Sequence, residues 1–120
     1  MAHYALLNSA NIVTQVITGV DETDTSENWE EFYGNLHNCT VKRTSYNTRN
    51  NQHRDGKTPF RGNYAGVNSK YYPDLDIFML PKPYDSWSMA TAQATWVAPS
   101  VMPTDNIYHW DESNQTWVSD

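Results

Sequence analysis

The sequence predicts a mainly β protein, built from successive antiparallel hairpins with one short α-helix near residues 26–34. Aromatic residues make up 13% of the 120 residues while leucine and isoleucine are sparse, and large rings suit pleated sheets better than helices. Short β-prone segments alternate with turn-tolerant ones along the chain. Prolines punctuate the second half, which argues against long helices there.

Four segments share one hairpin pattern: two β-prone residues, four turn-tolerant residues, and two further β-prone residues. Four-residue loops are common hairpin connections, so each segment predicts one hairpin. The loops are residues 8–11, 73–76, 91–94 and 112–115. The pairs predicted to face each other are Leu6 with Val13, Tyr71 with Phe78, Met89 with Trp96, and Trp110 with Trp117.

The remaining segments complete the predicted order. Ser26 is the expected N-cap of the helix and Gly34 its expected end. The ring stripe of the helix is expected to pack on a sheet, and consists of Trp29, Phe32 and Tyr33. Residues 38–44 alternate as a strand does, whereas residues 47–57 are polar and predict a long loop or arm that a neighbouring molecule orders.

Two parts are expected in the chain. Residues 1–80 form the main β-rich body with the helix, and residues 81–120 form a Trp-rich pair of hairpins that resemble an internal repeat. Residues 81–83 and residues 99–106 are proline-containing and predict extended linkers. The two parts are either separate units or one continuous domain.

Composition and charge exclude several classes. A net charge of −6 argues against general nucleic-acid binding and against an anionic membrane surface. No apolar run approaches the roughly 20 residues that span a bilayer, and the N-terminus lacks the features of a signal peptide. The single Cys39 excludes an internal disulfide framework and a cysteine-rich zinc site.

No catalytic or metal-binding pattern is present in the sequence. The four histidines are far apart, and the acidic segment 21–24 lacks the glycine and closing glutamate of a calcium loop. We therefore predict a protein that is not an enzyme, with no metal and no cofactor.

Charge is segregated along the chain. Residues 1–41 carry six acids and no base, residues 42–82 carry all eight bases against three acids, and residues 83–120 carry five acids and no base. The segregation indicates balance within the fold, head-to-tail contact between subunits, or a groove for a polyanion. The candidate basic contact segment consists of Arg43, Arg49, Arg54, Lys57 and Arg61.

Six rings near the C-terminus are candidates for a contact surface. They suit a protein interface, where Trp and Tyr are enriched, or stacking on a sugar. They are Tyr84, Trp87, Trp96, Tyr108, Trp110 and Trp117.

Segments along nearly the whole chain resemble a family of small virion-associated proteins of marine tailed phages, cyanophages especially. The segments occur in the family's order and are residues 2–7, 11–17, 44–48, 60–66, 76–78, 81–87, 108–113 and 116–118. The resemblance implies a virion component without catalytic residues, whose partners are other virion proteins in multiple copies.

The expected function is that of a structural or accessory virion protein that binds the capsid as a decoration or cement protein does. A tail, neck or fibre position is the first alternative. A carbohydrate-binding module for host attachment, with a host glycan on the C-terminal rings, is an alternative of another class. A soluble host-takeover protein absent from particles is the third.

Overall fold

The computed structural model describes residues 2–120, and it confirms a mainly β fold of antiparallel hairpins with a single short helix. The N-terminal half contains β1 (Ala2–Leu7), β2 (Val13–Gly19), α1 (Trp29–His37) and β3 (Thr40–Thr44). The middle contains β4 (Thr48–Arg49), β5 (Gln52–His53), β6 (Lys70–Tyr72) and β7 (Ile77–Met79). The C-terminal part contains β8 (Ser88–Ala90), a 3₁₀ turn (Thr91–Gln93), β9 (Thr95–Val97), β10 (Tyr108–Asp111) and β11 (Thr116–Ser119).

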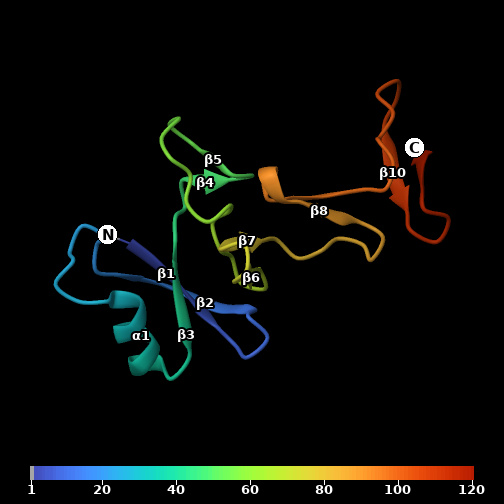
Figure 1. The fold of residues 1–120 in the computed structure, drawn as a ribbon. Helices are drawn as coiled ribbons and strands as arrows, with labels where there is room; N and C mark the ends of the chain where they lie inside the picture. The colour runs from blue at the N-terminus through green and yellow to red at the C-terminus, as the bar shows by residue number, and fades with distance from the viewer. Residues whose placement is uncertain (1) are drawn as a thin grey trace.

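The core lies on both faces of a three-stranded antiparallel sheet with the order β2-β1-β3 (Figure 1). Because side chains alternate along a strand, Tyr4 and Leu6 of β1 face one side while Ala5 and Leu7 face the other. Helix α1 covers the first face, where Tyr33 tilts against Tyr4 with ring centroids 4.9 Å apart. The β6–β7 hairpin covers the second face with Tyr71 and Phe78. The central strand is therefore buried on both sides.

The helix is placed later in the chain than the sequence predicted. Asn28, rather than Ser26, is the N-cap, and its Oδ1 accepts from the Glu31 N–H at 3.1 Å. Ser26 is engaged elsewhere, because its Oγ donates to Asp24 Oδ1 at 2.6 Å. The helix passes through Gly34 and ends before Asn38, whose φ of 54° supplies the left-handed cap instead of glycine. The expected ring stripe does reach the sheet, although Phe32 remains exposed at its edge.

Three of the four predicted hairpin registers are confirmed. Tyr71 faces Phe78, Met89 faces Trp96, and Trp110 faces Trp117. The first register is wrong, since Val13 pairs with Leu7 rather than Leu6 and a bulge follows Leu6. Ile12 leaves this hairpin to bridge Lys70 at the start of β6, and the Val13 N–H donates to Ser69 O at 2.7 Å. Pairing with a distant segment thus shifts the register by one residue.

The four predicted loops share one backbone geometry. In each loop the N–H of the fourth residue donates to the carbonyl of the first, at 3.0, 3.3, 3.2 and 3.2 Å in chain order. Each fourth residue is left-handed, and these residues are Asn11, Asp76, Ala94 and Gln115 with φ of 63°, 52°, 48° and 49°. The repeated pattern in the sequence therefore corresponds to a repeated turn.

The polar segment 47–57 is partly a tight hairpin rather than a long loop. Strands β4 and β5 are joined by Asn50 and Asn51, both with positive φ, as the two-residue hairpin turn requires. Thr48 anchors the hairpin to the body, because its Oγ1 accepts from Phe60 N–H at 3.0 Å and its carbonyl accepts from Tyr64 N–H at 2.9 Å. The chain's own contacts therefore order this segment.

The last two hairpins form an arm that extends from the body (Figure 1). The radius of gyration is 17.0 Å and the extents are 54 × 33 × 23 Å. A compact domain of this length has a radius of gyration of about 14 Å. The accessible surface of 7565 Å² likewise exceeds the roughly 6,600 Å² expected for this mass. Much of residues 81–120 is therefore unpacked against the rest of the chain.

Asn63 joins the arm to the body. Its buried Nδ2 donates to Phe78 O and to Ala94 O, both at 2.8 Å, and its Oδ1 accepts from Asn50 N–H at 2.8 Å. Gly62, with a φ of 77°, lies so close that a Cβ there would meet Ala94 Cβ at 3.0 Å. The turn of the third hairpin is thus docked firmly on the body, whereas the fourth hairpin contacts the segments that flank the third, at Ser86, Trp87 and Ser100.

Candidate functional site

Three indoles form the centre of the arm. Trp87 contacts Trp110 and Trp117 edge to face with centroids 6.0 Å apart in each case, and Trp110 lies 5.1 Å from Trp117. Trp110 and Trp117 are cross-strand partners on β10–β11, so the hairpin itself brings their rings together. Trp110 is 6% exposed, which makes it the core residue of this hairpin.

Glu112 ties the fourth hairpin to the segment before β8. Its Oε1 accepts from Ser86 Oγ at 2.6 Å and from Trp110 Nε1 at 2.8 Å, and its Oε2 accepts from Ser86 N–H at 3.1 Å. The Ser86 hydroxyl, followed by the Trp110 indole, holds the pKa of Glu112 below its usual range. The carboxylate therefore orients the Trp110 indole while remaining ionised itself.

A hollow of about 370 Å³ opens beside the indoles, and we call it the arm groove. Its walls include Trp87, Trp96, Trp117, Val101 and Met102. The Trp96 and Trp117 N–H groups donate to Leu80 O at 2.8 Å and to Ser100 O at 2.9 Å. Backbone carbonyls therefore fix two of the rings and leave apolar surface facing the groove.

The arm carries several exposed apolar side chains, of which Val97, Val101 and Met102 line the arm groove. Val101 is 92% exposed and Ile107 is 71% exposed, and both belong to the segment between β9 and β10. Met102, Val97 and Val118 are exposed on the same arm. The linker predicted at residues 99–106 supplies two groove residues that the prediction did not include, Val101 and Met102, and their apolar character between two prolines was the available signal. Clustered exposed apolar surface marks interaction sites.

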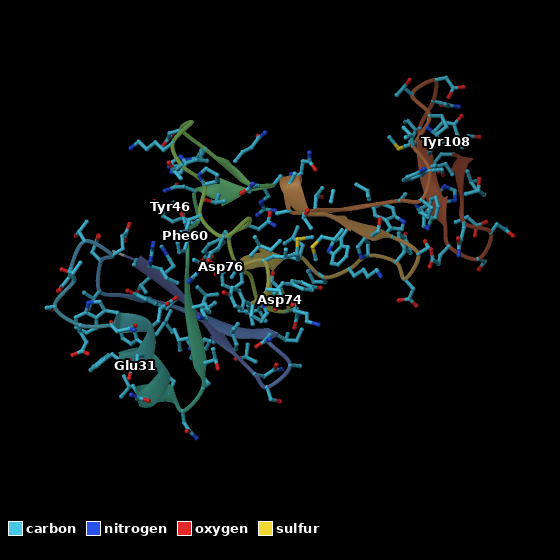
Figure 2. All side chains as sticks on the ribbon, viewed as in Figure 1. Glu31, Tyr46, Phe60, Asp74, Asp76 and Tyr108 are labelled. Atoms are coloured by element: carbon cyan, nitrogen blue, oxygen red, sulfur yellow. The ribbon has the colours of Figure 1, made fainter. Side chains whose placement is uncertain are left out.

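The six predicted ring residues divide into three positions. Tyr84 joins the indole centre, with its ring 5.6 Å from Trp87, and Trp96 lines the groove. Tyr108 lies on the far hairpin of Figure 2, where its hydroxyl donates to Asp105 Oδ1 at 2.8 Å. This hydrogen bond raises the pKa of Tyr108. Tyr84, Trp87, Trp96 and Trp117 therefore lie in or beside the groove, Trp110 is buried behind them, and Tyr108 is separate.

The indole centre offers little open ring surface on which a sugar could stack. A stacked sugar requires an open indole face, but Trp110 is buried and its neighbours meet edge to face. The groove walls are shaped by aliphatic side chains as well as by rings. Such a mixed apolar surface resembles the buried centre of a protein interface.

The predicted basic segment is split into two groups. Arg43 and Arg61 converge on the Phe60 ring, at 4.0 and 4.8 Å from its centroid. The Arg61 side chain is only 14% exposed, and its ion pairs are with residues of the same chain. Arg49 and Arg54 instead remain outside, on the β4–β5 hairpin, and Lys57 follows them in an exposed turn.

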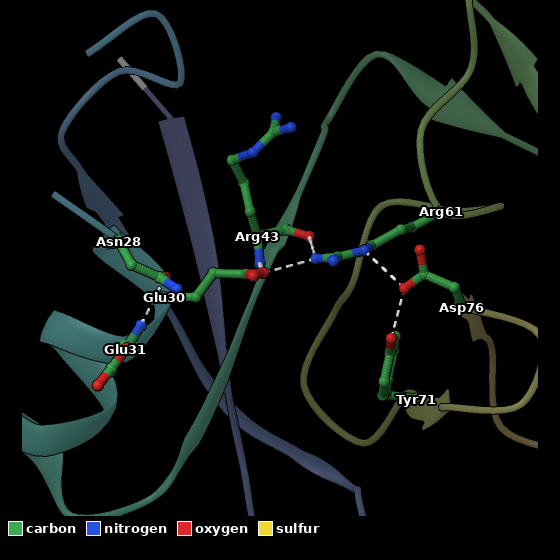
Figure 3. A network of polar contacts seen from close by, with 7 residues as sticks. All are labelled: Asn28, Glu30, Glu31, Arg43, Arg61, Tyr71 and Asp76. Atoms are coloured by element: carbon green, nitrogen blue, oxygen red, sulfur yellow. Dashed lines mark hydrogen bonds and ion pairs between the residues drawn. The ribbon is translucent and has the colours of Figure 1, made fainter. Parts of the chain in front are cut away.

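Arg61 is the centre of a network that joins the helix, β3 and the β6–β7 hairpin (Figure 3). Its Nη1 contacts Glu30 Oε2 at 2.6 Å and Arg43 O at 3.0 Å, and its Nε forms an ion pair with Asp76 Oδ1 at 2.8 Å. Tyr71 donates its hydroxyl to the same Asp76 oxygen. Burial, followed by this hydrogen bond, raises the pKa of Tyr71 to about 12. The network is structural, since its groups are paired with one another.

The β4–β5 hairpin carries a second hollow of about 440 Å³, which we call the basic hairpin surface. Its walls include Tyr46, Arg49, His53 and Arg54. Arg54 is 64% exposed, and its nearest acid is Asp55 at 3.9 Å, a separation that gives little attraction in water. These arginines are therefore open to an external partner.

Within residues 2–120 no three His, Cys, Asp or Glu side chains gather as metal ligands would. No helix in that range has the length and apolar character needed to cross a membrane. No family model, curated protein or solved structure matches the chain.

Proposed function

We propose that this protein is a structural accessory protein of a phage virion, bound to the capsid in many copies, whose C-terminal arm makes contacts with other polypeptides of the particle. The observation that carries the proposal is the arm itself: an extended pair of hairpins with an indole-lined groove and exposed Val101 and Ile107. The sequence resemblance to small virion proteins of marine tailed phages supports the same role.

An arm of this kind gains stability from a partner that covers it. An isolated two-stranded hairpin is marginally stable in water, and the arm consists of two of them. Covering Val101 and Ile107 would release roughly 25 cal/mol for each Å² of apolar surface removed from water. A partner that covers the arm therefore stabilises it, and repeated contacts in an assembly multiply the effect.

Mass spectrometry of purified particles of a phage that carries the gene tests the proposal. We expect the protein in particles at many copies, in a fixed ratio to the major capsid protein. Its presence at a few copies with tail proteins would favour the tail, neck or fibre alternative over the capsid. Its absence from particles, with abundant protein in the infected cell, would overturn a virion role.

A substitution in the same surface distinguishes a protein partner from a sugar partner. A Trp96→Ala variant removes one wall of the arm groove without touching the indole centre. We expect it to reduce incorporation into particles and to leave glycan-array signals at background, as for the unmodified protein. Specific glycan binding that the substitution abolishes would contradict the proposed role in favour of host attachment.

A further inference from the structure

We propose that the occupant of the arm groove is the basic hairpin surface of a second copy of this chain, so that copies join head to tail. The inference rests on the proposed function and deepens it by naming the partner. Three observations support it: the arm and the hairpin carry opposite charge, both surfaces expose apolar side chains, and the two surfaces lie apart on the molecule.

The arm that bears the groove and the basic hairpin surface carry opposite charge. Residues 81–120 carry five acids against Lys82, whereas residues 42–80 carry seven bases and three acids. Arg49 and Arg54 present this positive charge on the β4–β5 hairpin, clear of the internal network that occupies Arg61. Complementary charge guides the orientation of two partners and raises the rate at which they meet.

Apolar surface lies on both sides of the proposed contact. The arm groove offers three indoles and the exposed side chain of Val101. The basic hairpin surface offers the exposed ring of Tyr46, with the Arg54 guanidinium 5.7 Å from its centroid. Arginine and aromatic rings are enriched at the centres of protein interfaces.

The two surfaces lie in separate parts of one molecule. Their linings share no residue, because the basic hairpin surface is formed by residues between 46 and 54 and the arm groove by residues 87, 96–102 and 117. A contact between two different patches of identical chains is heterologous, and it generates a ring or an open filament. Pairing of two arm grooves would instead bring two acidic arms together, and like charges oppose that arrangement.

Sedimentation velocity of the full chain over a concentration series gives the first test. We expect reversible association that weakens as salt is raised, because the Debye length falls from about 10 Å at 0.1 M to about 3 Å at 1 M. Val101→Lys in the arm and Arg54→Glu in the hairpin are each expected to weaken association by about tenfold or more. Both side chains are exposed, so circular dichroism should show an unchanged fold.

Matched controls distinguish loss of the proposed contact from a general effect of the changed charge. Leu36→Lys is the control for Val101→Lys and places the same lysine at an exposed aliphatic position on α1. Lys70→Glu is the control for Arg54→Glu and reverses an exposed positive charge on β6. Both controls are expected to associate as the unmodified chain does. Equal weakening by a control and by its matched variant would overturn the proposed surfaces.

Mixing the two variants distinguishes head-to-tail contact from any other. The Arg54→Glu chain keeps its arm and the Val101→Lys chain keeps its hairpin, so together they can form one intact junction. At a concentration at which the unmodified chain just associates, we expect each variant alone to remain monomeric and the mixture to form a dimer that grows no further. A mixture that stays monomeric, or variants that associate fully alone, would overturn the inference.

The particle experiment separates this inference from the proposed function. A chain that is monomeric at all concentrations and yet abundant in particles would show that another virion protein occupies the groove, which overturns the inference alone. A chain that associates as described but is absent from particles would overturn the virion role alone.

Discussion

Replacing Asn63 with alanine tests the joint between body and arm. The Asn63 amide satisfies two buried carbonyls, those of Phe78 and Ala94, and one partly buried N–H, that of Asn50. A buried polar group without a partner costs about 1–3 kcal/mol. Two orphaned carbonyls, with a smaller cost for the better solvated N–H, give an expected loss of about 3 kcal/mol.

That loss is a large fraction of the 5–15 kcal/mol that typically stabilises a domain. Urea unfolding followed by tryptophan fluorescence and near-ultraviolet circular dichroism would measure it. Asn35→Ala is the matched control, since Asn35 is exposed on α1, and we expect a change within about 0.5 kcal/mol. A loss below about 1 kcal/mol for Asn63→Ala would refute the reasoning, because the three hydrogen bonds would then not hold the third hairpin in place.

Three further predictions concern single side chains. Tyr71→Phe removes a phenol whose pKa is about 12 when folded and about 10 when unfolded. The folded state holds this proton more tightly, so the stability that Tyr71 contributes is present below about pH 10 and is lost as the pH rises toward 12. The difference in Tm between the unmodified chain and Tyr71→Phe should therefore shrink across that range. Gln115→Gly, at an exposed position with φ of 49°, should stabilise the fourth hairpin by about 1 kcal/mol in thermal unfolding. Trp110→Ala should cost that hairpin about 3–5 kcal/mol and remove the near-ultraviolet signal of the packed indoles.

Each of these has a control or a contrary outcome. A Tm difference for Tyr71→Phe that stays constant or widens up to about pH 12 would mean that Asp76 and burial do not perturb the phenol. Gln115→Ala shortens the same side chain but keeps the Cβ, so it should bring no gain. Nuclear magnetic resonance signals of β1–β3 should survive Trp110→Ala, and their collapse would show that the body depends on the fourth hairpin.

Local chemistry made the hairpins predictable. Three registers follow from residues within a few positions of each loop, where the last loop residue turns left-handed and the flanking pairs meet. The first register was not predictable in this way, because Ile12 pairs with Lys70 far along the chain. The helix boundaries depended on whether Ser26 was free to cap, and Asp24 had already engaged it.

The functional surfaces were only partly predictable. The Trp-rich segment directed attention to the arm, yet ring content alone could not place Trp110 in the core or Tyr108 apart from the groove. Arg61 looked like a surface base, but its partners Glu30 and Asp76 come from distant segments. Asn63 gave no sequence signal at all, since its three partners are brought together by the fold.

Hydrogen–deuterium exchange on the free protein and on assembled particles tests most directly whether other polypeptides complete the arm. In the free protein, amides of β10 (Tyr108–Asp111) and β11 (Thr116–Ser119) should exchange far faster than those of β1 (Ala2–Leu7). In particles the same amides should slow by about a hundredfold, while those of β1 change little. Equal protection of the arm in the free and the assembled states would contradict the account.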